Sequence, residues 1–167
     1  FTERPHMETR NRVRGIAHNK NVAKITVLGV PDSPGISATL FEPLAEKGIS
    51  IDTIVQNVSV ERITDLTFTV AREDLEIAMD IVEPVAHDMG AGGCVSNAYL
   101  GNVSIVGTGM QHNPGYAARM FRALYEANVN IEMITTSEIR ITCIVAEDRV
   151  EDAVRALHET FLLDQVD

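Results

Sequence analysis

The chain has 167 residues, of which 45% are apolar, and carries a formal net charge of −10, so it suits one domain or two small ones with a packed core. The excess of acidic residues argues against a nucleic-acid surface or an anionic membrane as partner, because both bind clustered Lys and Arg. No apolar run approaches the roughly 20 residues of a membrane span and the N-terminus lacks a signal-peptide core, so we expect a cytoplasmic protein that meets small molecules and other proteins.

The first third of the chain has the pattern of two strands and one helix. Residues 1–12 are polar and without periodicity, and we expect a disordered segment, a linker or a tag there. Residues 13–18 form a short β-compatible run, which is followed by a turn at residues 19–21. Residues 23–30 predict a strand, and the apolar spacing of residues 33–47 predicts a helix.

The next part of the chain completes a first repeat. The alternation of residues 49–59 and 64–71 predicts two strands joined as a hairpin. Asp74 is suited to cap a second helix, in which Pro84 indicates a kink or an early end. Residues 94–100 predict a fourth strand, so this part of the chain has the order β-α-β-β-α-β.

The same order then begins again, which indicates an internal duplication. Ile25 aligns with Ile105 and Asp32 with His112, both at an offset of 80 residues and without a gap between them. The expected elements of the second copy are a strand at 102–110, a helix at 114–127, a strand at 129–138, a tighter hairpin and a closing helix at 150–161.

The second copy ends without a fourth strand, because residues 162–167 are too few and too acidic to form one. Its sheet edge needs a cover, and the unassigned strand at residues 13–18 is the candidate. We therefore expect a first domain at 22–100 and a discontinuous second domain made of 13–21 and 101–167.

The sequence shows no catalytic or metal-binding arrangement. The five histidines are scattered without HxxxH or HExxH spacing, and neither a GxxxxGK[ST] phosphate loop nor a GxSxG elbow is present. Cys94 and Cys143 lie far apart without CxxC or Cys/His spacing, which predicts two buried free thiols. We expect no catalytic residue, no metal and no cofactor; an enzyme with unrecognised chemistry is the disfavoured alternative.

Two similar stretches, residues 32–35 (DSPG) and residues 112–115 (HNPG), each lead from an apolar strand into a helix. Ser33 and Asn113 are good N-cap residues, and the proline after each falls at the first helical position. A helix N-terminus presents unpaired N–H groups and partial positive charge, and so can hold a carboxylate or a phosphate. Taken alone, the motif is more typical of an ordinary capped helix start than of a ligand site.

The first of these turns fits an α-amino acid when it is combined with the neighbouring strand. The Asp32 carboxylate can balance an ammonium, the N–H groups at the helix start can hold a carboxylate, and Gln56 can bond a side-chain hydroxyl. The second copy has His112 in place of Asp32 and Thr136 in place of Gln56. An imidazole cannot balance an ammonium, so we expect the two turns to be functionally unequal.

Several strings of the chain resemble the tandem ACT-domain regulatory region of aspartate kinase, over about residues 13–161. They are KITVLGVPDSPG, ISIDTIVQNVS, TDLTFTV, VSIVGTGM, VNIEMITTSEIRI and ALHETF, of which the last two are specific. The resemblance implies an α+β fold of two ferredoxin-like βαββαβ ACT domains, with antiparallel sheets each covered by helices on one face. It also implies a regulatory β subunit, or a cut regulatory domain, that lacks the catalytic kinase domain and carries out no phosphoryl transfer of its own.

The resemblance further implies feedback inhibition by threonine, lysine or both, with the effector held where ACT domains pair across a homodimer. Carried onto this chain, the effector site comprises Asp32, Pro34, Gly35, Ile36, Ser37 and Gln56, faced from the partner chain by Asn128, Asn130 and Ile131. A second pseudo-site comprises Gln111, His112, Asn113, Pro114 and Gly115, with Ile49, Ser50 and Asp52.

Threonine is the expected effector, because Gln56 suits a hydroxyl and no additional acid is evident for a lysine side chain. The expected protein partners are a second copy of the chain and the catalytic subunit or domain of an aspartate kinase. The alternative function is a structural module that pairs and assembles the kinase without binding a ligand.

Overall fold

The computed structural model describes residues 13–58, 61 and 63–162, and the expectation for residues 1–12 lies outside this range. Contacts divide the described chain into two compact units. The first unit is residues 21–99, and the second unit combines residues 13–20 with residues 100–162. Within the described part of the chain, no helix has both the length and the apolar character needed to cross a membrane.

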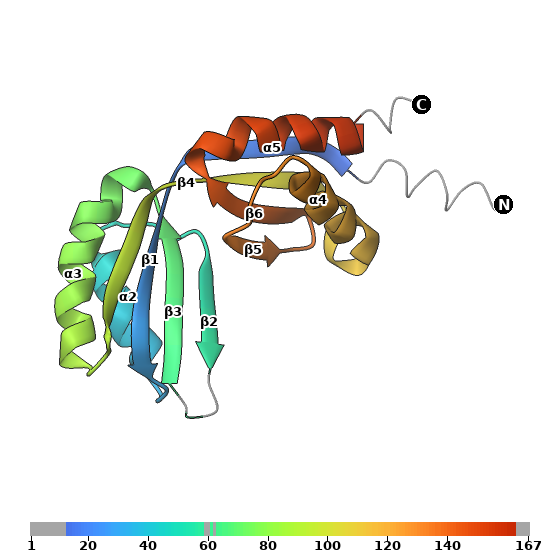
Figure 1. Ribbon diagram of the computed structural model, residues 1–167. Helices are drawn as coiled ribbons and strands as arrows, with labels where there is room; N and C mark the ends of the chain where they lie inside the picture. The colour runs from blue at the N-terminus through green and yellow to red at the C-terminus, as the bar shows by residue number, and fades with distance from the viewer. Residues whose placement is uncertain (1–12, 59–60, 62, 163–167) are drawn as a thin grey trace. The chain divides into compact units, whose positions relative to one another are not determined.

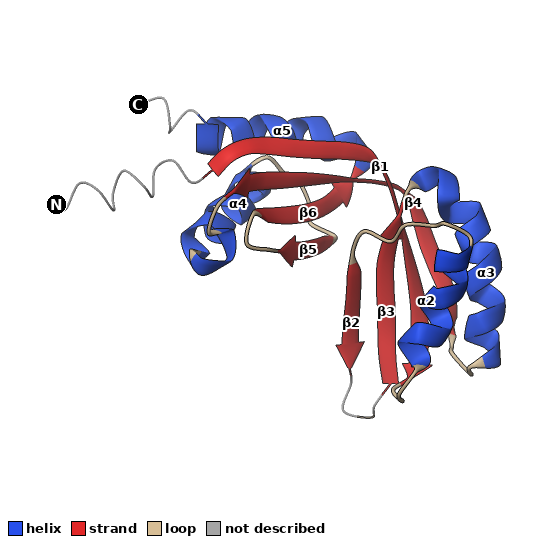
Figure 2. Cartoon of the chain, turned by 180° about the vertical axis from the view of Figure 1, so that it is seen from behind, coloured by secondary structure: helices blue, strands red, loops and turns tan. Residues whose placement is uncertain are grey.

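The first unit has the order β-α-β-β-α-β (Figure 1). Its elements are β1 (Val13–Pro31, from residue 21 on), α2 (Ile36–Glu46), β2 (Ile54–Val58), β3 (Ile63–Val70), the 3₁₀ turn η1 (Arg72–Asp74), α3 (Leu75–Asp88) and the start of β4 (Gly93–Gly107). The strand order is β2-β3-β1-β4, and β3 pairs antiparallel with both β1 and β2. Figure 2 shows α2 and α3 on the same face of these strands.

The second unit repeats this arrangement. Its elements are the end of β4, the 3₁₀ turn η2 (Met110–His112), α4 (Pro114–Glu126), β5 (Met133–Thr136), β6 (Arg140–Ala146), the 3₁₀ turn η3 (Glu147–Arg149), α5 (Val150–Leu157) and the π-helical turn η4 (His158–Leu162). The start of β1 lies next to β4, which gives the order β1-β4-β6-β5. Residues 13–20 thus occupy the place that β4 occupies in the first unit.

Each unit has its own apolar core between its strands and helices. In the first unit, Ile25 and Phe68 from the strands pack with Leu44 and Val82 from the helices, and Phe41 meets Phe68 edge to face at 5.1 Å. The alternating side chains of β1 and β3 supply the strand side of this core, as period-2 patterns predict. The α+β fold of two βαββαβ repeats is therefore confirmed.

The gap-free alignment of the two copies is wrong by two residues on their first strands. Ile25 pairs with Phe68, whereas Val103 pairs with Cys143, so Val103 and not Ile105 takes the place of Ile25. A pair of hydroxyl groups across the strands supports the same alignment, in which Ser104 corresponds to Thr26. Thr26 Oγ1 lies 3.0 Å from Thr67 Oγ1, and Ser104 Oγ lies 2.6 Å from Thr142 Oγ1. The second copy contains two more residues between its first strand and its first helix than the first copy does, and the turn η2 lies in this connection.

The turn expected at residues 19–21 is also wrong, because β1 runs through it without a break. The Asn21 amide donates to Glu73 Oε2 at 2.6 Å, and Asn21 Oδ1 accepts from the Arg72 N–H at 3.0 Å. Lys20 Nζ binds Glu151 Oε1 at 2.9 Å. These long-range partners satisfy polar side chains that otherwise favour a turn. The hydrogen bond from Asn21 lowers the pKa of Glu73, and the one from Lys20 lowers the pKa of Glu151.

Other element boundaries differ by a few residues. The strand expected at 49–59 begins only at Ile54, because the residues before it form a loop. The strand expected at 129–138 is shortened to β5. Pro84 does not end its helix, since α3 continues to Asp88. The closing helix is α-helical only to Leu157 and then becomes the π-helical turn η4.

Gly101 in β4 is required by the close approach of β1 and α5. A Cβ added there would lie 2.5 Å from Val150 Cγ2 and 2.8 Å from the Asn19 carbonyl oxygen. Gly101→Ala is therefore expected to lower the free energy of unfolding by about 1–3 kcal/mol, measured by urea denaturation. Gly15→Ala in β1 is the matched control, because nothing lies within 4 Å of its added Cβ. Equal unfolding midpoints for the two variants would contradict this packing.

Candidate functional site

The end of β1 is bent by an irregularity in its pairing with β3. The register shifts between Val27 and Val30, and Gly29 between them has a φ of 62°, in the region that glycine tolerates best. The Gly29 N–H donates to Asp65 Oδ1 at 3.0 Å, and the Gly92 N–H donates to the Leu28 carbonyl at 2.7 Å. A bulge of this kind re-aims the residues that follow it, which here are those leading to Asp32.

The start of α2 differs from the predicted cap. Ser33 is not the N-cap: Gly35 holds that position with a φ of 86°, and the helix begins at Ile36. The left-handed conformation of Gly35 delays the helix by two residues, and the Ile36 N–H closes a turn onto the Ser33 carbonyl at 3.3 Å. The N-cap Gly35 makes no side-chain cap hydrogen bond, and the N–H groups that follow Ile36 in the first turn have no intrahelical partner.

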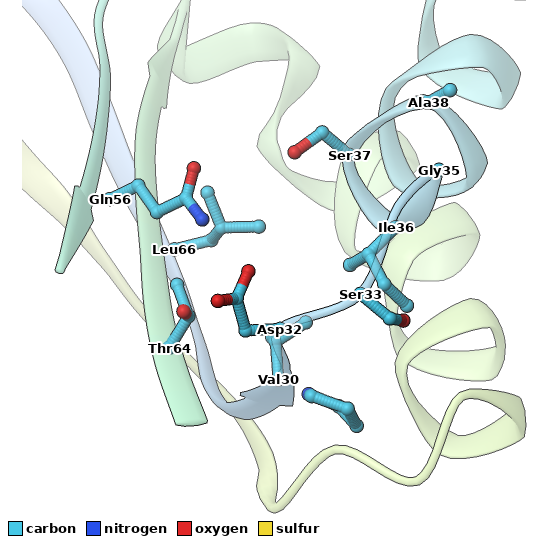
Figure 3. Close-up of a pocket in the computed structure, with 11 residues that line it drawn as sticks. Val30, Asp32, Ser33, Gly35, Ile36, Ser37, Ala38, Gln56, Thr64 and Leu66 are labelled. Carbon is cyan, nitrogen blue, oxygen red and sulfur yellow. The ribbon is translucent and has the colours of Figure 1, made fainter. Parts of the chain in front are cut away.

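A cavity of about 290 Å³ lies where this turn meets β2 and β3 (Figure 3). The cavity is lined by Val30, Pro31, Asp32, Ser33, Gly35, Ile36, Ser37, Ala38, Gln56, Thr64 and Leu66. Of the predicted effector residues, it brings together Asp32, Gly35, Ile36, Ser37 and Gln56. Pro34 is exposed and does not belong to the described lining.

The polar side chains of the cavity come from the turn before α2, from α2 itself, from β2 and from β3. Figure 3 shows Asp32 from the turn, Gln56 from β2 and Thr64 from β3 around the same space. Gln56 is opposite Leu66 in the β2–β3 ladder, so its side chain lies on the helix-covered face of the sheet. Among the described lining residues, Asp32 is the only acid and none is basic.

Sequence reasoning missed Thr64 and the apolar wall formed by Val30 and Leu66. The alternation of residues 64–71 places Thr64 on the same face as Leu66 and Phe68, which is the buried face. A threonine at a position where the pattern expects an apolar residue was the available signal. Thr64, which pairs with Val30 near the end of β1, is therefore part of the site.

Asn128, Asn130 and Ile131 lie in the second unit and are not in the described lining of the cavity. Asn128 has a φ of 61°, and its carbonyl accepts from Arg149 Nη2 at 3.2 Å. Ile131 packs against the core of the second unit, whereas Asn130 is exposed.

The predicted pseudo-site has a different helix start. Asn113 caps α4 as predicted: Asn113 Oδ1 accepts from the Gly115 N–H at 3.1 Å, and Pro114 opens the helix. Gln111 and His112, in η2, are exposed.

The first-copy residues assigned to the pseudo-site are spread along one loop. Ile49 is buried in the core of the first unit, while Ser50 and Asp52 are exposed. The Asp52 N–H donates to the Thr69 carbonyl at 3.1 Å, which ties this loop to β3.

The two cysteines are free thiols in different surroundings. Cys143 is buried, and burial raises its pKa to about 12. Cys94 is only half-buried, which corrects the expectation of two buried thiols; burial and the nearby Glu83 carboxylate raise its pKa. The part of the chain that the structure describes holds no group of three or more His, Cys, Asp or Glu side chains placed to bind a metal.

Comparison with known families finds two matches along the chain. An ACT domain model matches residues 24–87, and a second ACT domain model matches residues 103–161. Among curated proteins, an aspartate kinase from Stutzerimonas stutzeri is 44% identical over 152 residues, which are 91% of this chain and 37% of the relative. An aspartokinase from Corynebacterium glutamicum is 44% identical over 151 residues, 89% of this chain and 36% of the relative. The chain thus spans about a third of the length of these relatives.

Solved structures give matches of similar extent. The regulatory subunit of aspartate kinase from Thermus thermophilus, in a ligand-free form, is 38% identical, with a TM-score of 0.85 over 90% of this chain and 99% of that chain. The aspartate kinase from Synechocystis is 43% identical, with a TM-score of 0.83 over 92% of this chain and 27% of that one. A structure of aspartokinase alpha and beta subunits matches with a TM-score of 0.82 and 39% identity over 90% of this chain and 99% of that chain.

Proposed function

The chain belongs to the family of aspartate kinase regulatory regions built from two ACT domains, and from this premise we propose that it binds an end-product amino acid in the cavity at the start of α2. Binding would impose allosteric feedback inhibition on aspartate phosphorylation in the biosynthesis of lysine, threonine and methionine. The catalytic subunit or domain of an aspartate kinase is the partner that receives the signal. A second copy of the chain is the partner that completes the site.

The cavity carries this proposal because its groups match an α-amino acid. The uncapped N-terminus of α2 offers N–H groups and partial positive charge to a carboxylate, and its cap position is held by a glycine without a side chain. Asp32 offers a negative charge to an ammonium. A volume of about 290 Å³ is at the lower end of known ligand pockets, which suits a small ligand.

Threonine is the effector that this lining favours. Gln56 lies on β2 at the wall of the cavity, where its amide can bond a ligand hydroxyl. Asp32 is the only acid of the described lining and is needed for the α-ammonium, so a lysine side chain would bring a second ammonium without a matching carboxylate. Lysine remains the second candidate, acting alone or together with threonine.

The first copy is a better effector site than the pseudo-site. In the second copy, the Asn113 side chain already accepts from the Gly115 N–H, and an exposed imidazole, His112, replaces the acid. The second turn therefore lacks both the uncapped helix start and the counter-charge for an ammonium.

Inhibition requires that the effector bind one state of the assembly more tightly than another. We propose that Asn128, Asn130 and Ile131 from a partner chain close the cavity across a homodimer. The effector would then join two chains and select the dimer geometry that holds the attached kinase inactive. A module that only dimerises and assembles the kinase is the competing function.

Thermal unfolding with and without free amino acids tests the proposal. Threonine at about 100 times its Kd should stabilise the protein by roughly 2.7 kcal/mol, which raises the melting temperature. Lysine is run as the second candidate, and isoleucine and valine control for branched side chains without a hydroxyl. If none of the four shifts the transition, the protein is not an amino-acid sensor and the structural module is the better reading.

A further inference from the structure

Thr64 carries a hydroxyl group that the protein itself leaves unbonded. The residue is 1% exposed, and Thr64 Oγ1 is the one buried side-chain polar atom without a hydrogen-bond partner among the residues described. Buried hydroxyls are almost always paired, because an unpaired one loses its hydrogen bonds to water without replacement. An exception of this kind needs a physical reason.

Neighbouring threonines on the same strand follow the rule. Thr67 Oγ1 pairs with Thr26 Oγ1 at 3.0 Å, and Thr69 Oγ1 accepts from the Thr53 N–H at 3.1 Å. The strand β3 therefore satisfies its other hydroxyls within the fold. Thr64 differs from them in that it lines the cavity at the start of α2.

The position of Thr64 places its hydroxyl near the acidic end of that cavity. Thr64 is paired with Val30 across the β1–β3 ladder, and Asp32 follows Val30 by two residues. Gln56 is opposite Leu66, two residues further along β3, which is about 7 Å in an extended strand. Figure 3 shows Thr64 beside Asp32, with Gln56 higher along the strands.

An ammonium bound by Asp32 has three N–H donors. A single carboxylate cannot accept all three of these hydrogen bonds with good geometry. The remaining donor needs an acceptor once water has left the cavity, and a threonine hydroxyl can accept as well as donate. Thr64 Oγ1 is buried in this structure although Thr64 lines the cavity, so a ligand reaches this atom when the lining shifts on binding.

We propose that Thr64 is a specificity-determining residue of the effector site, whose hydroxyl accepts a hydrogen bond from the α-ammonium of the amino acid held by Asp32. This inference rests on the proposed function and assigns a contact within it. It makes the site selective for a free α-ammonium, since an N-acetyl group both removes the charge and leaves fewer N–H donors.

Isothermal titration with threonine and urea denaturation without ligand test the role of Thr64 together. Thr64→Val keeps the shape and removes the hydroxyl, so it is expected to weaken threonine binding about tenfold, the effect of one hydrogen bond. Its unliganded stability should stay equal or rise, because an unpaired polar group is replaced by an apolar one. Thr64→Ser, which keeps the hydroxyl, should bind within a few-fold of the unchanged protein.

Thr67→Val is the matched control on the same strand. It breaks the hydroxyl pair with Thr26, so it should lower unliganded stability and leave the threonine affinity unchanged. Threonine binding by Thr64→Val that equals that of the unchanged protein would overturn the inference alone. Loss of unliganded stability in Thr64→Val as large as in Thr67→Val would also overturn it. Absence of binding by the unchanged protein would instead overturn the proposed function, and the inference with it.

Discussion

Asp32→Asn is expected to weaken threonine binding by about 2–5 kcal/mol, which is roughly 30-fold or more. The side chain keeps its size and loses the negative charge that the cavity offers to an α-ammonium. Asp32 is the only acid of the described lining, so no neighbouring carboxylate can replace it there. Isothermal titration calorimetry with threonine measures the loss.

Asp80→Asn is the control for Asp32→Asn, since Asp80 is exposed on α3 in the same unit and the change in net charge is identical. It should bind threonine as the unchanged protein does. Analytical ultracentrifugation adds a second readout: Asp32→Asn should have the same oligomeric state as the unchanged protein, which separates sensing from the proposed dimerisation. Unchanged threonine affinity in Asp32→Asn would show that the cavity does not hold an ammonium at this residue.

Removal of all residues before Asn21 is expected to lower the free energy of unfolding of the second unit by about 4 kcal/mol or more. Losses of this size are typical of changes that disrupt a protein core. Val13 is 2% exposed in the core of that unit, and Ile16 packs against the same core. The deletion also leaves β4 with an open edge where β1 lay and removes the Lys20–Glu151 ion pair. Hydrogen exchange should show lost protection in β6 and retained protection in β3.

Two point variants show which side chains of the deleted segment contribute to the stability of the second unit. Val13→Ala should cost about 2 kcal/mol through lost burial of its methyl groups, whereas Arg14→Ala, at an exposed position, should change stability by no more than about 0.5 kcal/mol. Equal protection of β6 with and without residues 13–20 would mean that this segment contributes nothing to the second unit.

About half of the cavity could be anticipated from residue types alone. Asp32 and Gln56 were identified because their charges and hydrogen-bonding groups match an amino acid, and the structure places both at one cavity. The predicted Ser33 cap was wrong because a glycine two residues later adopts a left-handed φ of 86°. The same motif in the second copy does cap its helix through Asn113. Four residues of similar sequence thus form two different helix starts, one at Gly35 and one at Asn113.

The sequence by itself determined the two βαββαβ repeats, since periods of two and 3.6 residues reveal which face of each strand or helix is buried. Short sequence motifs also indicated the family and identified Asp32 as the acidic residue of the site. Only the tertiary structure decided that β1 runs unbroken from Val13 to Pro31 and that Thr64 lines the cavity without a partner of its own. Both depend on partners far along the chain: Glu73 and Glu151 hold Asn21 and Lys20 in the strand. Local patterns record which face is buried, but they carry no information on which distant group will meet a given side chain.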